Sequence, residues 1–234
     1  MVKQEIQDAI KAGIPIFIGY FPAAVAFGIL SKTTGVTLLE SFLFSAVVFA
    51  GASQFIALNL LATGMGFTGI ILTTLLVNFR HFLMSAYLST RIKETLKKYY
   101  IFLAFGVTDE VFSVLSFKSG PLSKGFVFAV QMSAYSGWVL GTLCGYLLGG
   151  FLPPILSQSM GVALYALLLA ILMPEIKASL LSLFLALSSG LLNWLLVYLD
   201  ILPKGWSIIV CILVIATAGA FLTLNGSPKE EIRG

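Results

Sequence analysis

The sequence predicts an all-α membrane protein with several segments that cross the bilayer. Of its 234 residues, 59% are hydrophobic and only 10% are charged, and the mean hydropathy is +1.01. Soluble domains are much less apolar than this. The apolar runs are continuous, whereas strands of a membrane β-barrel alternate apolar and polar residues. We therefore expect helices, which satisfy their own backbone hydrogen bonds, in a single membrane domain over residues 1–234.

Eight apolar segments follow one another, and a helix needs about 20 residues to cross the hydrocarbon core. They lie at residues 13–30, 37–62, 66–90, 100–117, 125–149, 156–173, 179–199 and 205–225. The fourth segment is short and carries Asp109 and Glu110 at its centre, so we expect a half-span or a re-entrant segment. The fold prediction is thus seven or eight hydrophobic segments, some of them broken or re-entrant.

Loop charges predict which side of the membrane each loop faces. The densest basic cluster, at residues 91–98, should be cytoplasmic, and the loops at 61–66 and 150–157, which lack Lys and Arg, should be external. A fourth segment that does not cross would also make Lys118 and Lys124 cytoplasmic. That arrangement leaves Lys3 and Lys11 outside, which conflicts with the positive-inside rule.

A faint internal similarity suggests two repeat halves, at about 13–117 and 125–225. Phe27-Gly28 precedes the apolar run 42–55, and Gly141 precedes the apolar run 160–173. With a non-crossing fourth segment the two halves would have opposite orientations. Secondary transporters often contain such inverted repeats, with the substrate site at the midplane. Chance similarity is the alternative.

The third segment carries an arginine and the only histidine of the chain near its centre, in Asn78-Phe79-Arg80-His81. A charge at this depth costs about 3 kcal/mol unless it is paired or hydrated, and it usually marks a functional site. On an unbroken helix Asn78 and His81 share one face with Ser85, and Arg80 points roughly the other way. We expect Arg80 to pair with Asp109 or Glu110, and less so with Glu40, and His81 to exchange protons. A purely structural ion pair is the alternative.

Two further clusters contain polar groups at depth. The second segment holds Gly51-Ala52-Ser53-Gln54, where small side chains expose the backbone. Either the helix breaks there and binds the charged groups of a solute, or the small residues allow close helix packing and Gln54 bonds across the contact. The fourth segment holds Thr108-Asp109-Glu110, whose carboxylates point about 100° apart on a helix. One carboxylate could meet Arg80 and the other a proton or cation, unless both are solvated in a turn.

A stripe of small residues is better explained by packing. It consists of Ser133, Gly137, Gly141, Gly145 and Gly149, which recur every four residues. Such a pattern allows two helices to approach closely, either within the chain or with a separate subunit.

Several functional classes lack support in the sequence. There is no nucleotide-binding loop, catalytic triad or zinc motif, and we expect no cofactor and no enzymatic activity. Cys144 and Cys211 lie in apolar segments without a ligand pattern, so no metal site is predicted. The net charge of +4 resides mostly in short loops, which is typical of topology signals and not of nucleic-acid binding.

The same clusters resemble the AzlC family, the large subunit of two-component exporters of branched-chain amino acids. The similar pieces are Phe27-Gly28 with Gly35, the run from Ser45 to Phe55, Asn78-Phe79-Arg80-His81, and Thr108-Asp109-Glu110-Val111-Phe112. They cover about the first half of the chain. The resemblance implies proton-coupled export of valine, leucine, isoleucine or methionine across a bacterial-type inner membrane. It also implies a small AzlD-type membrane partner, for which the glycine stripe is a candidate dock.

Three hypotheses follow. In the leading one, an exporter, Gly51, Ala52, Ser53, Gln54 and Asn78 bind the solute, and Arg80, His81, Asp109 and Glu110 carry protons or tune charge. In the second, the same polar midplane lines a channel for a small polar solute. In the third, the protein is a membrane scaffold whose polar residues only hold helices together.

Overall fold

The computed structural model describes residues 2–92, 94–118, 120, 122–149, 151, 169, 172–173, 176–177, 179–202 and 206–226. Apart from one isolated bridge between Ile92 and Leu122, the regular structure of these residues is helical, as predicted. Five described helices are long and apolar enough to span a bilayer, at Gln7–Thr33, Phe67–Arg91, Lys124–Leu148, Leu180–Tyr198 and Trp206–Thr223. The chain is thus a multi-pass membrane protein. Most of the expected segment at 156–173 falls outside the described residues.

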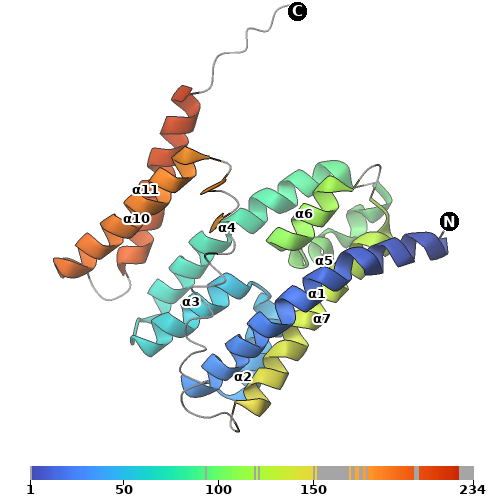
Figure 1. Cartoon of the computed structure of the whole chain (residues 1–234), viewed down its shortest axis with the longest axis horizontal. Helices are drawn as coiled ribbons and strands as arrows, with labels where there is room; N and C mark the ends of the chain where they lie inside the picture. Colours follow the sequence, from blue (N-terminus) through green and yellow to red (C-terminus); the bar gives the residue numbers. More distant parts are fainter. Residues whose placement is uncertain are drawn as a thin grey trace, which may run out of the picture.

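The centre of the molecule is a parallel pair of helices, α1 (Val2–Thr33) and α7 (Lys124–Leu148), which lie side by side in Figure 1. The small-residue stripe of α7 forms this contact. A Cβ added to Gly145 would lie 2.1 Å from the carbonyl oxygen of Val25, and one added to Gly28 would lie 2.2 Å from that of Thr142. Only glycine permits this approach.

This contact corrects the expectation that Gly137, Gly141, Gly145 and Gly149 form a candidate dock for a partner subunit. Helix α1 already covers all four positions. The packing alternative is therefore correct, and the contact lies within the chain.

The second apolar segment does not cross the membrane as we expected. It forms α2 (Leu38–Leu43), a π-helical turn η1 (Phe44–Val48) and α3 (Gly51–Ala62). The first part runs antiparallel to α7, because Tyr146 donates to Val36 O, 3.0 Å away, and Tyr135 donates to Ala46 O, also 3.0 Å away. The chain then turns at Phe49, where φ is +45°, and α3 returns beside α4 (Phe67–Arg91).

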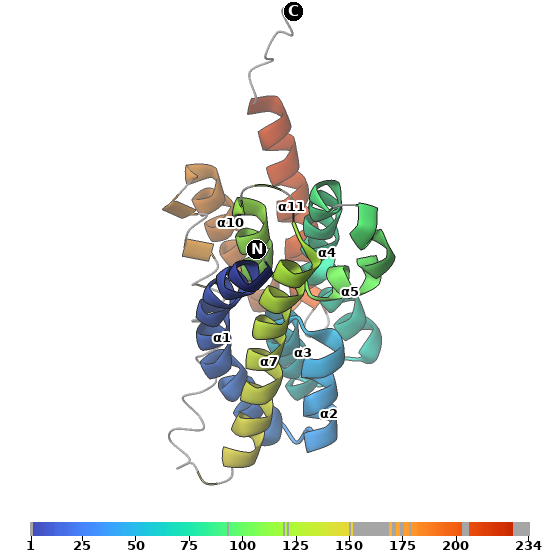
Figure 2. The ribbon, with the colours of Figure 1, turned by 90° about the vertical axis from the view of Figure 1, so that its right-hand side faces the viewer.

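The fourth segment is re-entrant, as the sequence suggested. After the short 3₁₀ helix η2 (Glu94–Tyr99) it forms α5 (Tyr100–Phe105) and α6 (Asp109–Phe117). Helix α5 lies beside α7, where Gln131 Nε2 donates to Leu103 O at 2.7 Å. Helix α6 returns along α4, where Arg91 donates to Lys118 O at 2.8 Å. Figure 2 shows α2 and α3 in one half of the molecule and α5 in the other.

Two re-entrant segments change the predicted topology. The N-terminal end of α1, the η2 turn and the start of α7 now lie on one side, with α1, α4 and α7 crossing. Lys11 then lies on the same side as Arg91 and Lys98, and the positive-inside rule favours the cytoplasm for this side. With the second segment no longer counted as a crossing, the position of Lys11 no longer conflicts with the positive-inside rule.

The structure also contains an inverted arrangement, at a different place from the expected one. Helix α1 followed by α2–α3, and helix α4 followed by α5–α6, are each a span followed by a re-entrant pair, in opposite orientations. Both lie within residues 2–117. The expected halves at 13–117 and 125–225 stay a prediction, because part of the second half lies outside the described residues.

The last two helices, α10 (Leu180–Tyr198) and α11 (Trp206–Gly226), form a hairpin at the edge of the molecule in Figure 1. Helix α11 contacts the rest of the protein through Ile209, which packs with Leu60 and Met65. Helix α10 buries none of its residues against the described part of the chain. The site described next therefore depends on α1 to α7.

Candidate functional site

The two re-entrant pairs turn at the same depth, and a small cavity lies between the turns. We call it the midplane pocket; its volume is about 40 Å³. It is lined by Tyr20, Phe49, Ala50, Gly51, Ala52, Arg80, His81, Thr108, Asp109, Glu110 and Trp138. A cavity of this size holds a few waters or one charged group. Non-helical backbone at this depth is tolerated where it is enclosed by protein in this way.

Helix α3 begins at the pocket without a side-chain cap. Its first residue, Gly51, lies against Trp138, and an added Cβ would lie 2.6 Å from the indole ring. Because the first N–H groups of a helix have no partner within it, the N–H groups at this end face the pocket unpaired by any described side chain. The helix dipole adds a partial positive charge here.

Gln54 stabilises the turn between η1 and α3 from the side away from the midplane pocket. Its Oε1 accepts from Ala50 N at 3.1 Å and from Trp138 Nε1 at 3.0 Å, and its Nε2 donates to Ser45 Oγ at 3.2 Å. The side chain is 1% exposed. These contacts match the packing alternative for Gln54, which braces the turn and does not line the midplane pocket.

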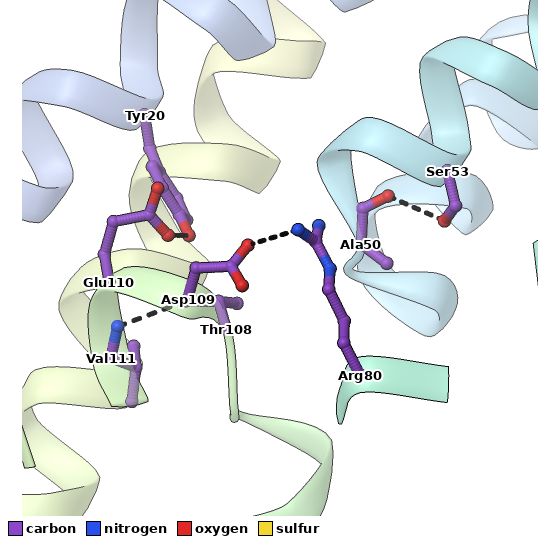
Figure 3. A network of polar contacts seen from close by, with 8 residues as sticks. All are labelled: Tyr20, Ala50, Ser53, Arg80, Thr108, Asp109, Glu110 and Val111. Carbon is purple, nitrogen blue, oxygen red and sulfur yellow. Dashed lines mark hydrogen bonds and ion pairs between the residues drawn. The ribbon is translucent and has the colours of Figure 1, made fainter. Parts of the chain in front are cut away.

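Helix α6 begins on the opposite wall of the pocket, and its first turn is occupied by its own side chains. Thr108 caps it by accepting from Val111 N at 3.3 Å. Asp109 pairs with Arg80 of α4, Nη1 to Oδ2, at 3.0 Å, and the phenol of Tyr20 donates to Glu110 Oε2. Figure 3 shows Arg80 reaching from α4 into the space between Asp109 and Ala50.

The ion pair is accessible, because the side chains of Arg80 and Asp109 are 35% and 32% exposed. Arg80 Nε is buried and has no hydrogen-bond partner among the described residues. The guanidinium therefore keeps donor capacity for an additional acceptor. The expected pairing of Arg80 with a carboxylate of the fourth segment is confirmed, and its partner is Asp109.

Helix α4 is unbroken, but the faces of its central residues differ from the expectation. Arg80 and His81 both line the midplane pocket, since neighbours 100° apart can reach one cavity. Asn78 instead lines a second cavity of about 340 Å³ between η1, α3 and α4, together with Ser53 and Gln54. Asn78 Nδ2 donates to Ser53 Oγ at 2.9 Å.

The expected solute-binding residues are thus divided. Gly51 and Ala52 meet Arg80, His81, Asp109 and Glu110 in the midplane pocket. Ser53 and Gln54 of α3 and Asn78 of α4 line the second cavity instead.

Two lining residues were missed by the sequence analysis, Tyr20 and Trp138. A tyrosine at the middle of an apolar span and a tryptophan within a glycine stripe both carry a polar hydrogen that needs a partner when buried. That signal was present in the sequence. Their partners, Glu110 and Gln54, are distant along the chain, so the sequence alone did not connect them.

An apolar cavity of about 220 Å³ lies beside the midplane pocket, between α4, α5, α6 and α7. Its lining includes Ser85, one turn from His81, and Val107, next to Thr108. No group of three or more His, Cys, Asp or Glu side chains that could hold a metal ion occurs in the described part of the chain.

Comparisons with known proteins place the chain in a family. A family model described as AzlC protein matches residues 15–152. Inner membrane protein YgaZ of Escherichia coli K12 is 35% identical over 178 residues, covering 73% of each chain. The branched-chain amino acid transport protein AzlC of Bacillus subtilis 168 is 30% identical over 148 residues, covering 62% of this chain and 58% of that protein. No solved structure matches. The chain therefore belongs to the AzlC family, a family of membrane transport proteins.

Proposed function

We propose that the protein exports neutral branched-chain amino acids (valine, leucine and isoleucine, and the similar methionine) as the large subunit of a two-component, proton-coupled exporter. One observation carries this proposal. An uncapped helix start and an arginine face two carboxylates across a single midplane pocket. A zwitterion needs both charges matched at a short distance, and this pocket offers both.

The carboxylate of the amino acid is assigned to the α3 side of the pocket. Gly51 and Ala52 line the pocket together with Arg80, whose Nε has no hydrogen-bond partner among the described residues. Helix N-termini and guanidinium groups are the usual partners of carboxylates in proteins. In secondary transporters, half-helices at the midplane bind the carboxylate of the substrate in this way.

The ammonium group and the transported proton are assigned to the α6 side. Asp109 is already matched by Arg80, whereas the described residues pair Glu110 with the phenol of Tyr20 and with no Lys or Arg. An ammonium group or a proton would supply a counter-charge to this carboxylate at this depth. We infer that Glu110 carries the proton, that Tyr20 orients it, and that His81 takes part in proton exchange.

The side chain of the substrate is assigned to the adjacent apolar cavity. The midplane pocket alone is too small for a whole amino acid, so binding requires the wall between the two cavities to open. Ser85→Leu should narrow the apolar cavity. We expect it to reduce leucine export about tenfold relative to alanine export in the same protein, as expected for the loss of one to two methylene-sized contacts.

A small multi-span subunit of the AzlD type is proposed as the partner. The name of the B. subtilis relative states branched-chain amino acid transport, and the resemblance adds the second subunit. The α7 stripe cannot be its dock, because α1 covers that face.

The direct test is efflux of labelled leucine from liposomes under an imposed pH gradient, with and without an AzlD-type subunit. We expect gradient-dependent, saturable efflux that is lost in Glu110→Gln while the protein remains folded. Unsaturated flux without pH coupling would indicate a channel. Folded protein without any flux in both preparations would reject the transport proposal.

A further inference from the structure

A second charged feature lies at the cytoplasmic end of the molecule, far from the midplane pocket. Two lysines converge on the ring of Tyr99, the last residue of η2. Lys124 Nζ lies 4.0 Å from the ring centroid, and Lys98 Nζ lies 5.1 Å from it. Hydrogen bonding to Lys124 and its charge, with a smaller effect of Lys98, hold the pKa of the Tyr99 phenol below its ordinary value.

The described side chains provide no anion for these lysines. Among them the only ion pair is Arg80–Asp109. Two ammonium groups beside one tyrosine ring therefore leave a local excess of positive charge with hydrogen-bond donors. A phosphate group matches this arrangement, because its oxygens accept from several donors at once.

An apolar groove continues from the same place toward the middle of the membrane. Tyr99 packs edge-on against Phe128, with ring centroids 6.0 Å apart, and Phe128 is also part of the wall of the groove. The groove has a volume of about 190 Å³ and is lined by Phe102 and Phe105 of α5 and by Met132 and Tyr135 of α7.

The groove is open to the side, and the polar side chain at its floor is hydrogen-bonded within the protein. Phe102 and Met132 are 66% and 56% exposed. Gln131, the polar residue at the floor, donates to Leu103 O. Phe128, Met132 and Tyr135 lie on one face of α7 over roughly 10 Å of helix length. The groove thus suits an apolar chain that lies along the helix.

We propose that this combined feature is a binding site for an anionic phospholipid of the cytoplasmic leaflet. Lys98, Lys124 and Tyr99 bind the phosphate of the headgroup, and the groove between α5 and α7 receives one acyl chain. Both parts are needed, because the headgroup contacts select the charge and the groove selects a lipid over a free phosphate. The site is independent of the proposed transport function.

Native mass spectrometry of the purified protein in an equal mixture of phosphatidylglycerol and phosphatidylcholine tests the proposal. Each lysine near a headgroup contributes about a fivefold preference for the anionic lipid. We expect the wild type to retain phosphatidylglycerol about 25-fold better than phosphatidylcholine. The double variant Lys98→Gln/Lys124→Gln should reduce that ratio to nearly one.

Two further variants control the test. Lys32 also lies over a tyrosine, Tyr146, at 5.4 Å from its ring, but at the other end of α7; Lys32→Gln should leave the ratio unchanged. Met132→Trp fills the groove, and we expect it to lower retention of both lipids at this site. An unchanged ratio in the double variant would overturn the headgroup assignment. Displacement of the lipid by inorganic phosphate alone, with no effect of Met132→Trp, would identify a phosphate site and reject the lipid. None of these readouts depends on transport.

Discussion

Helices α3 and α6 both begin at the midplane pocket, yet their first turns are satisfied in opposite ways. Helix α3 starts with Gly51 and Ala52 and has no side-chain cap. Helix α6 starts with a threonine cap and two carboxylates, Asp109 and Glu110. Both helix dipoles favour negative charge at this point. In α6 the side chains of the first turn supply that negative charge, whereas the first turn of α3 has no acidic side chain.

The comparison indicates how one small pocket can bind both ends of a zwitterion. In the proposed exporter, the N–H groups at the uncapped start of α3 donate to the carboxylate of the substrate, and the acidic start of α6 binds its ammonium group or a proton. Arg80 lies between them (Figure 3), because it pairs with Asp109 while its Nε has no partner in the described part of the chain. The predictions below change one side of the pocket at a time.

Arg80→Gln should have the largest effect on binding. It removes the charge that serves both sides and leaves Asp109 without its partner. We expect leucine affinity to fall about 30-fold, or about 2 kcal/mol, which is the low end for breaking such a pair because this one is partly exposed. Equilibrium binding of labelled leucine to detergent-solubilised protein measures it.

Arg91→Gln is the matched control. Arg91 also joins α4 to α6, but it donates to backbone carbonyls at the far end of α6. We expect it to lower thermal stability with less than a twofold change in leucine affinity. Equal losses of affinity in the two variants would mean that Arg80 acts only by holding α6 in place.

Gly51→Ala should have the next largest effect. The added Cβ would lie 2.6 Å from the ring of Trp138, so the start of α3 must shift. The loss of about one hydrogen bond to a charged group predicts about a tenfold decrease in leucine affinity. Gly66, the N-cap residue of α4, has no atom within 4 Å of an added Cβ and is the control. A Gly66→Ala variant that loses as much affinity would contradict the assignment.

Tyr20→Phe should have a smaller effect, on the α6 side alone. It removes the hydroxyl that donates to Glu110 but no charge. We expect about a fivefold decrease in proton-driven leucine efflux, with the affinity for a carboxylate analogue unchanged. Tyr146→Phe, which removes a hydroxyl bonded to Val36 O near the other end of α7, should leave efflux unaffected.

Asn78→Ala should have the smallest effect on binding. Its amide donates to Ser53 Oγ of α3, and Asn78 does not line the midplane pocket. We expect a loss of stability of about 0.6 kcal/mol, the average for such a bond in a membrane, and less than a twofold change in leucine affinity. A large loss of affinity with normal stability would return Asn78 to the binding site, as the sequence analysis expected.

Local composition predicted much of this arrangement. The long apolar runs predicted the helical membrane fold, the small residues around Gly51 predicted the break, and the carboxylates in the short fourth segment predicted its re-entrant form. The pairing of Arg80 with that segment followed from the cost of an unpaired charge.

Contacts between distant residues could not be predicted in the same way. The 25-residue length of the 38–62 region equals that of a span, and only the positive φ of Phe49 and the direction of α3 distinguish a re-entrant pair. The glycine stripe of α7 indicated a close neighbour but not its identity, which α1 provides. Tyr20 and Trp138 belong to the site because they donate hydrogen bonds to Glu110 and Gln54, which are 90 and 84 residues away along the chain.

The central claim is that the two helix starts bind different ends of the substrate, and half-substrates test it most directly. Isoamylamine lacks the carboxylate of leucine, and 4-methylpentanoate lacks its ammonium group. Their binding should be measured on wild type, Gly51→Ala and Glu110→Gln. We predict that Gly51→Ala weakens only 4-methylpentanoate and that Glu110→Gln weakens only isoamylamine. Equal weakening of both analogues by each variant would contradict the division of the pocket between α3 and α6.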